Sequence, residues 1–236
     1  MTLSRTDLQD QILQKLAAAR NGPPPLSPEA LDASLDAILS RHPLGQDAWV
    51  FGYGSLIWNP LFHFNAREHA VLHGYHRRFC LRSELGRGSP GRPGLVLGLE
   101  RGGSCRGLAF RIAAHHLRDE LRLLWTREMV TGAYSPRWVD LRSQTGRRLR
   151  AIAFVMNRDY PNYAGGLSIE ETAQTLASAR GELGSCAEYL FRTHDSLLEI
   201  GVRDRYLSTL ARSVREMLGP SDSGPPTADR TPPQRD

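Results

Sequence analysis

The stretch Phe51-Gly52-Tyr53-Gly54-Ser55-Leu56-Ile57-Trp58 begins where a short apolar run, residues 48–51, breaks into two glycines around one tyrosine. A strand that ends in this way predicts a sharp turn, because glycine leaves the backbone free to change direction. Such a turn can aim consecutive N–H groups at one point and so bind a carboxylate or an oxyanion. The alternative is a glycine-rich turn beneath an aromatic cluster. Neither the dinucleotide-binding nor the P-loop glycine pattern occurs here.

Strand and helix patterns follow this stretch in an order that indicates the fold class. Strands are expected over residues 69–80, 94–112, 137–141 and 149–156, and helices over 114–130 and from Ser168 and Ser185 onward. Arg101-Gly102-Gly103-Ser104 has the pattern of a hairpin turn. Because strands come first and most helices later, the order predicts an α+β fold with a mixed sheet rather than a doubly wound α/β fold.

Both ends of the chain differ from this central region. Residues 5–20 read as a helix with Thr6-x-x-Gln9 as its capping box, and a second helix is expected to start at Ser27 with Pro28 in its first position. We expect residues 1–47 to form a helical appendage to the domain at 48–218. Residues 219–236 carry five prolines and lack apolar periodicity, which predicts a disordered tail.

Composition indicates a globular protein with one compact core, since 40% of the 236 residues are hydrophobic and 23% are charged. No apolar run reaches the roughly 18 residues of a membrane helix, and the N-terminus lacks the pattern of a signal peptide. Three widely spaced cysteines, Cys80, Cys105 and Cys186, favour neither a disulfide framework nor a thiolate metal site. We therefore expect a cytoplasmic protein that does not bind a membrane.

The net charge of +5 raises the possibility of a polyanionic partner. The arginines are spread along the chain, however, and no block of five like charges occurs. We therefore expect no nucleic-acid partner, and the sequence identifies no protein partner.

Glu128 is singled out by helical geometry. Leu117, Leu121 and Leu124 form one apolar stripe of the helix expected over residues 114–130, and Glu128 is the next residue on that stripe. Burial and the negative end of the helix dipole both disfavour a carboxylate anion, so both are expected to raise the pKa of Glu128. A raised pKa suits a group that takes up and returns a proton near neutral pH. The alternative is a buried glutamate paired with an arginine.

The remaining acidic residues have simpler explanations. Glu171 and Glu188 each follow a serine by three residues, which predicts capping boxes at two helix starts. Glu84 and Glu100 stand beside glycine-rich turns and are expected to be solvated.

No metal site or catalytic nucleophile is expected. His73 and His76 are three apart in an expected strand, so their side chains should point to opposite faces. No Gly-x-Ser-x-Gly elbow occurs, and Ser55 has no evident histidine partner.

Taken together, the motifs resemble the ChaC family of γ-glutamylcyclotransferases, with the resemblance extending over residues 49–218. The segment Val50–Trp58 is similar to the family's N-terminal signature. Further similar segments follow in the family's order: residues 77–79, 91–96, 105–111, Arg127-Glu128 before Gly132-Ala133-Tyr134, Asn162-Tyr163-Ala164-Gly165, and Glu188-Tyr189-Leu190.

This resemblance implies a γ-glutamylcyclotransferase-like fold, a small mixed β-barrel flanked by helices, with residues 48–218 as the catalytic domain. It implies cleavage of glutathione to 5-oxoproline and cysteinylglycine without metal or cofactor. The α-amino group of the glutamyl unit attacks its own side-chain carbonyl, and Glu128 is the implied acid/base. The implied substrate-binding residues are Val50, Phe51, Gly52, Tyr53, Gly54, Ser55, Leu56 and Tyr163. The alternatives are a cyclotransferase for other γ-glutamyl peptides or amines, and a non-catalytic γ-glutamyl-binding module.

Overall fold

The structure is a computed structural model that describes residues 3–10 and 23–219. The continuation of the first expected helix to residue 20 lies outside the described residues, and so does nearly all of the expected tail. Within the described ranges, no helix is both long and apolar enough to cross a membrane.

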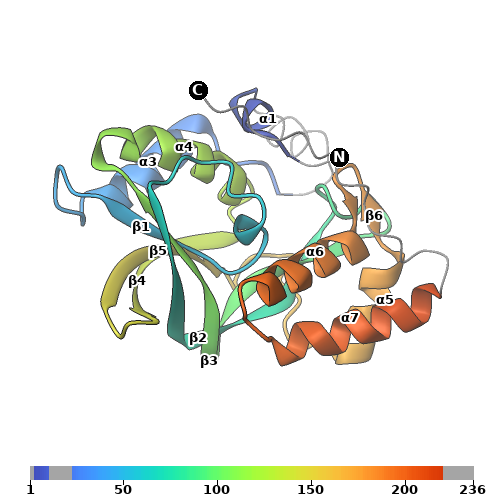
Figure 1. The fold of residues 1–236 in the computed structure, drawn as a ribbon. Coiled ribbons are helices and arrows are strands. Elements are labelled where there is room, and N and C mark those ends of the chain that lie inside the picture. Colours follow the sequence, from blue (N-terminus) through green and yellow to red (C-terminus); the bar gives the residue numbers. More distant parts are fainter. Residues whose placement is uncertain (1–2, 11–22, 220–236) are drawn as a thin grey trace, which may run out of the picture.

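A closed barrel of five strands forms the centre of the fold (Figure 1). The strands are β1 (Ala48–Gly52), β2 (Ala66–Ser83), β3 (Gly94–Ile112), β4 (Tyr134–Ser143) and β5 (Arg148–Met156). They are hydrogen-bonded in the order β1-β3-β2-β4-β5. Strand β1 closes the barrel, because it pairs antiparallel with β3 on one side and parallel with β5 on the other. The expected α+β fold with a mixed β-barrel is confirmed.

The hairpin turn expected at Arg101-Gly102-Gly103-Ser104 is wrong, because these residues continue strand β3. Arg101 pairs with Tyr75 and Ser104 with His73, so the two glycines lie opposite the single residue Gly74. All three glycines have left-handed backbones, with φ of 82° for Gly74 and 106° and 69° for Gly102 and Gly103. They form a β-bulge, which bends a strand without ending it. The actual connection between β2 and β3 is residues 84–93.

The helices lie in two groups on different sides of the barrel (Figure 1). Helix α4 (Leu117–Glu128), which follows the 3₁₀ turn η2 (Ala114–His116), packs against α3 (Pro28–Leu39). Helices α5 (Ile169–Ser178), α6 (Cys186–Glu199) and α7 (Arg205–Leu218) form the second group, with the short hairpin β6 (Arg180–Gly181) and β7 (Gly184–Ser185) beside them. The predicted N-caps Ser168 and Ser185 are confirmed, since their hydroxyls accept from the backbone N–H groups of Glu171 and Glu188.

The described N-terminal residues form helices that pack on α4. The expected Thr6-x-x-Gln9 capping box is wrong: helix α1 (Arg5–Gln9) begins two residues earlier than a Thr6 cap allows, because Ser4 is its N-cap and forms a capping box with Asp7. The predicted start of α3 is confirmed: Ser27 caps it and Pro28 is its first residue. The apolar side chains of α3 belong to the main core, so this helix packs as part of the domain. The boundary at residue 47 stays a prediction.

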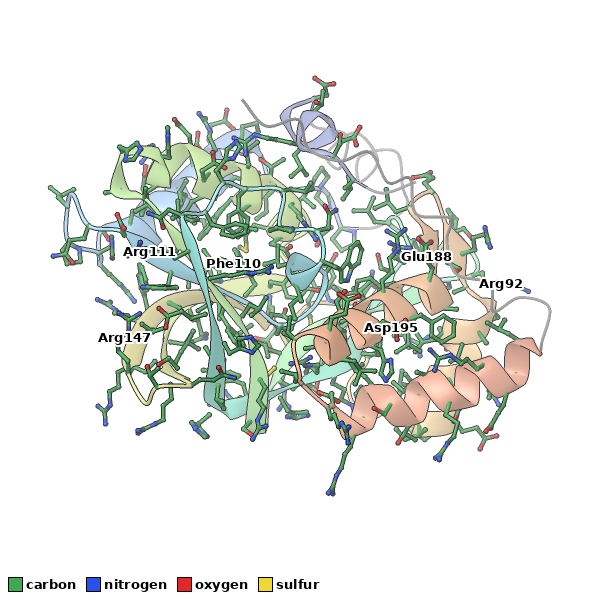
Figure 2. The ribbon with its side chains drawn as sticks, viewed as in Figure 1. Arg92, Phe110, Arg111, Arg147, Glu188 and Asp195 are labelled. Atoms are coloured by element: carbon green, nitrogen blue, oxygen red, sulfur yellow. The ribbon has the colours of Figure 1, made fainter. Side chains whose placement is uncertain are left out.

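Side chains alternate between the inside and outside of the barrel, as the strand periodicity requires. Figure 2 shows this for two neighbours in β3: Phe110 lies within the fold and Arg111 points outward. Phe110 is fully buried and contacts the rings of Phe62 and Phe64.

In β1 both Val50 and Phe51 are fully buried. Val50 is on the face that the helices cover, because its partner Ile152 pairs in turn with Trp138, whose Nε1 donates to the carbonyl of Ile38 in α3. The 3₁₀ turn η1 (Ser55–Ile57) follows β1.

Candidate functional site

A cavity of about 180 Å³ opens beside the end of β1 and is the candidate site. Residues from distant parts of the chain form its wall, among them the loop after β1, the turn end of the β2–β3 hairpin, the end of α4, and the start of α6. They are Leu3, Tyr53, Gly54, Ser55, Leu56, Trp58, Asn59, Leu81, Ser83, Leu85, Arg87, Val96, Leu97, Arg127, Glu128, Val130, Thr131, Tyr134, Phe154, Leu183 and Tyr189. Among these described residues Glu128 is the only acid.

Glu128 is the last residue of α4, and its side chain is only 15% exposed. The predicted stripe explains its position, because Leu117, Leu121 and Leu124 are all buried on the same face. Burial raises the pKa of Glu128 above the ordinary value of 4.5, and the positive charge of Arg127 lowers it by less. The sequence suggested two alternatives for Glu128, an inward carboxylate with a raised pKa or a carboxylate paired with an arginine. The structure shows both features in the same residue.

Arg127 joins the end of α4 to the loop after β1. Its Nε lies 3.0 Å from Oε1 of Glu128. Its Nη2 donates to the Ser55 hydroxyl oxygen at 2.7 Å, and its Nη1 donates to the backbone carbonyl of Asn59. The hydroxyl of Ser55 is thus held by an arginine, which is not the partner of a serine nucleophile.

Three tyrosines surround the carboxylate: Tyr53 and Tyr189 are buried, and Tyr134 is partly buried. The hydroxyl of Tyr53 donates to the carbonyl of Phe154 at 2.9 Å, and that of Tyr134 donates to the carbonyl of Leu97 at 2.7 Å. Burial, with the charge of Glu128 as a lesser cause, raises the pKa of Tyr189 to about 12 and raises the pKa values of Tyr53 and Tyr134 well above 10. All three phenols are therefore neutral at physiological pH, and the carboxylate lies among polar but uncharged groups.

Gly52, the last residue of β1, and Gly54, in the loop after it, are needed for close packing rather than for a left-handed backbone. Neither Gly52 nor Gly54 has a positive φ. A Cβ on Gly52 would lie 2.8 Å from the Phe110 ring, and a Cβ on Gly54 would lie 3.3 Å from the Tyr189 hydroxyl. In the 3₁₀ turn η1, which follows, the first N–H groups have no acceptor within the turn. Those N–H groups belong to residues on the cavity wall.

The structure brings together some of the sequence-predicted site residues and separates others. Glu128 and the segment 53–56 share the cavity. In the described part of the chain, the residues 50–52 do not line this cavity, since they lie buried in β1. Tyr163 does not line it either: it forms a bridge with Leu81, and its hydroxyl donates to Glu100.

The expectation that Glu100 is solvated is wrong, because this residue is only 5% exposed. Its carboxylate accepts from Tyr163 and from Nη2 of Arg158 at 3.3 Å, and Nε of Arg78 lies 3.8 Å away. Strand β3 continues past the glycines, so Glu100 lies inside a sheet rather than at the tip of a turn. This buried cluster is outside the cavity.

Sequence reasoning missed four side chains of the cavity wall as site residues: Arg87, Arg127, Tyr134 and Tyr189. Arg87 is buried, lies over the Tyr189 ring at 5.5 Å, and pairs with Glu188 at 3.2 Å. The carboxylate of Glu188, expected to close a capping box, is thus held by Arg87 and also by Arg192. Tyr134 and Tyr189 fall in segments of the family resemblance, which was the one available signal.

The possible metal ligands do not converge. In residues 3–10 and 23–219, no group of three or more His, Cys, Asp or Glu side chains has the arrangement of a metal site. His76 instead contacts the carbonyl of Gly102 through Nδ1.

Comparison with known proteins gives one consistent result. A model of the family described as "ChaC-like protein" matches residues 48–217. A glutathione-specific gamma-glutamylcyclotransferase of Escherichia coli (strain K12) is 42% identical over 192 residues, which cover 81% of this chain and 83% of the relative. Glutathione-specific gamma-glutamylcyclotransferase 1 of Homo sapiens is 32% identical over 179 residues, covering 73% and 81%.

A solved structure shares the fold. The crystal structure of the yeast gamma-glutamyl cyclotransferase specific to glutathione matches with a TM-score of 0.68 at 24% identity, over 73% of this chain and 97% of that one. The family match and the relatives agree with each other, and the solved structure shares the fold. This chain belongs to the ChaC-like protein family.

Proposed function

We propose that this protein is a glutathione-specific γ-glutamylcyclotransferase, which converts glutathione to 5-oxoproline and cysteinylglycine. The relatives carry this name, and they match most of their own length. The observation that carries the proposal is Glu128: one buried carboxylate of raised pKa on the wall of a cavity that has no other acid among the described residues.

The chemistry needs one proton acceptor of this kind. The α-ammonium group of the substrate cannot attack until it loses a proton, and the Glu128 carboxylate takes that proton. The freed nitrogen then forms a bond to the γ-carbonyl carbon, which becomes tetrahedral. Glu128 returns the proton to the cysteinylglycine nitrogen as the old C–N bond breaks. The ring nitrogen then gives up its second proton, which Glu128 passes to the released amine, so the products are the neutral five-membered lactam and the cysteinylglycine ammonium. No atom is gained or lost in this rearrangement.

The other cavity groups bind and orient the substrate in this proposal. The backbone N–H groups of residues 53–56 bind the glutamyl carboxylate or the developing oxyanion, a charge that fixed donors stabilise without reorganising. Arg127 holds the Glu128 side chain and the Ser55 hydroxyl in place. Since both reacting atoms belong to one molecule, holding the substrate in a folded conformation supplies much of the advantage in rate.

The reaction requires no electron transfer and no protein nucleophile, so we propose that it proceeds without a cofactor. The cytoplasm stays the proposed location. All three cysteines are free and buried, an arrangement that supports a reducing compartment.

The test is the detection of 5-oxoproline after the protein is incubated with glutathione in the presence of a chelator. A panel that includes γ-glutamylalanine and γ-glutamyl amines, at equal concentrations, measures specificity. We expect the rate of 5-oxoproline formation to be highest with glutathione among the substrates of the panel. A preference for γ-glutamylalanine would reassign the substrate, and the absence of 5-oxoproline from every reaction would end the proposal.

A further inference from the structure

The N-terminal segment, defined here as residues 3–10, reaches the cavity, although Leu3 precedes the start of β1 by about 45 residues in the sequence. Leu3 is part of the cavity wall. It packs in a small apolar cluster with the buried residues Leu8 and Val130 and the partly buried Leu85, separate from the main core. The tyrosines around Glu128 belong to the main core instead. Leu3 and Leu85 thus form a part of the wall that packs separately from the tyrosines.

An ion pair anchors the N-terminal segment to α4. Arg5 donates to both carboxylate oxygens of Glu120, from Nη1 at 2.7 Å and from Nη2 at 2.8 Å. This two-point geometry fixes direction as well as distance. Glu120 is only 3% exposed, and it also accepts from the backbone N–H of His63 at 2.9 Å. In any other arrangement the buried Glu120 carboxylate would lose the charged donor Arg5. The ion pair therefore holds the N-terminal segment in place against α4.

A second anchor leads from Leu3 to the candidate acid/base. The carbonyl of Leu3 accepts from Nδ2 of Asn59 at 3.0 Å. The carbonyl of Asn59 accepts from Arg127, whose Nε lies 3.0 Å from Glu128. The position of Leu3 is therefore set by the same loop that holds Arg127.

We propose that Leu3 is a specificity-determining residue, which limits the size of the substrate beyond its γ-glutamyl unit. This inference rests on the proposed function. Once the glutamyl unit lies at Glu128 and the N–H groups of residues 53–56, the rest of the substrate must extend along the remaining wall. Leu3, Leu85 and Leu183 border that space. The family match covers residues 48–217, so Leu3 comes from outside the matched region, whereas Leu85 and Leu183 lie within it.

The physical basis is the cost of forcing extra atoms against a held apolar side chain. Differences of one or two methylene groups in an apolar pocket change kcat/KM by roughly 10-fold to 200-fold. S-hexylglutathione has the same reacting atoms as glutathione and carries a hexyl group in place of the thiol hydrogen. The chemical difference between the two substrates is the same for every variant, so a change in the ratio of their kcat/KM values between variants reports a change in fit at the wall.

The experiment compares this ratio in the wild type, Leu3→Ala, Leu3→Phe and Arg5→Gln. Leu3→Ala opens the wall and should raise the ratio by about 10-fold. Leu3→Phe narrows the space and should lower the ratio. Arg5→Gln loses the two-point ion pair and should shift the ratio in the same direction as Leu3→Ala. Thr6→Ala is the matched control, because Thr6 lies in the same segment but is exposed and outside the cavity wall; its ratio should equal that of the wild type.

The outcomes separate this inference from the proposed function. If the wild type produces no 5-oxoproline from glutathione, the proposed function fails. If the wild type is active and Leu3→Ala keeps the wild-type ratio, the role of Leu3 is overturned, whatever Arg5→Gln does. An equal rise in Thr6→Ala also overturns it, because the effect would then come from loosening the segment in general. Melting curves of all variants show that each is folded.

Discussion

The guanidinium of Arg127 lies 3.0 Å from the carboxylate of Glu128, its neighbour in the chain, at the end of α4. Both residues line the same cavity, because α4 ends beside it. Burial raises the pKa of Glu128 and Arg127 opposes that shift only in part. The carboxylate is therefore held in position by a charge that does not suppress its ability to accept a proton.

Glu128→Gln should abolish most of the turnover while the fold persists. The amide keeps the shape of the side chain but cannot accept a proton, and loss of acid/base catalysis costs roughly 100-fold to 10,000-fold in rate. Production of 5-oxoproline and a melting curve on the same preparation measure both properties. A well-folded variant with near-normal turnover would rule out Glu128 as the acid/base.

Glu100→Gln is the matched control for that variant. Glu100 is also buried and also paired with arginines, but it lies outside the cavity. Its substitution should lower the melting temperature, since Tyr163 and Arg158 lose a charged acceptor, and should leave turnover per folded molecule unchanged. A loss of turnover as large as that of Glu128→Gln would show that the assay responds to general damage.

The stability of the wild type and that of Glu128→Gln should depend differently on pH. The native pKa of Glu128 lies above 4.5, so folding favours the protonated form. That contribution is fully present below 4.5 and is lost as the pH rises through the raised native pKa, because an anion must then remain buried. Glu128→Gln has no such loss. Its melting temperature relative to the wild type should therefore increase as the pH is raised from about 4.5 to 8. A constant difference over this range would contradict a raised pKa.

The activity should show the same pKa as an acidic limb. Glu128 must be ionised to accept the ammonium proton, so kcat/KM should fall as the pH drops through the pKa of the free enzyme. Because burial raises that pKa, the midpoint of the fall should lie above the ordinary glutamate value of 4.5. A rate profile in constant-ionic-strength buffers measures it. A midpoint at or below 4.5 would mean that Arg127 outweighs burial in the working enzyme.

Substitutions of Gly54 should reduce activity in proportion to their size. A Cβ would lie 3.3 Å from the Tyr189 hydroxyl and 3.6 Å from Leu97, so alanine is tight and valine collides. Glutathione turnover should fall moderately in Gly54→Ala and severely in Gly54→Val. Adding Tyr189→Phe removes the atom in the way, so Gly54→Ala should cost less in that background than in the wild type. Equal costs in both backgrounds would exclude crowding as the cause.

The sequence predicted those features that a local pattern determines. The order of strands and helices indicated an α+β fold with a mixed sheet, the family resemblance implied a barrel, and a stripe of three leucines placed Glu128 inside the fold. Arg101-Gly102-Gly103-Ser104 was misinterpreted because two glycines look alike in a turn and in a bulge; the partner strand decides between them, and Gly74 lies far away in sequence. Arg87 and Tyr189 reach the cavity only when α6 packs beside η1, so no spacing in the chain indicates that they meet Glu128.

Tyr163 offers the sharpest contrast between the resemblance and the structure. The resemblance implies that it binds substrate, but its hydroxyl donates to Glu100, outside the cavity. Gly165 permits this arrangement, because a Cβ there would lie 2.0 Å from the Tyr163 hydroxyl oxygen. Tyr163→Phe should therefore lower the free energy of unfolding by about 1.5–3 kcal/mol, the range for a hydrogen bond to a charged group. The KM for glutathione should not change, which denaturant titration and steady-state kinetics test together. A several-fold rise in KM with unchanged stability would instead support a direct contact between Tyr163 and the substrate.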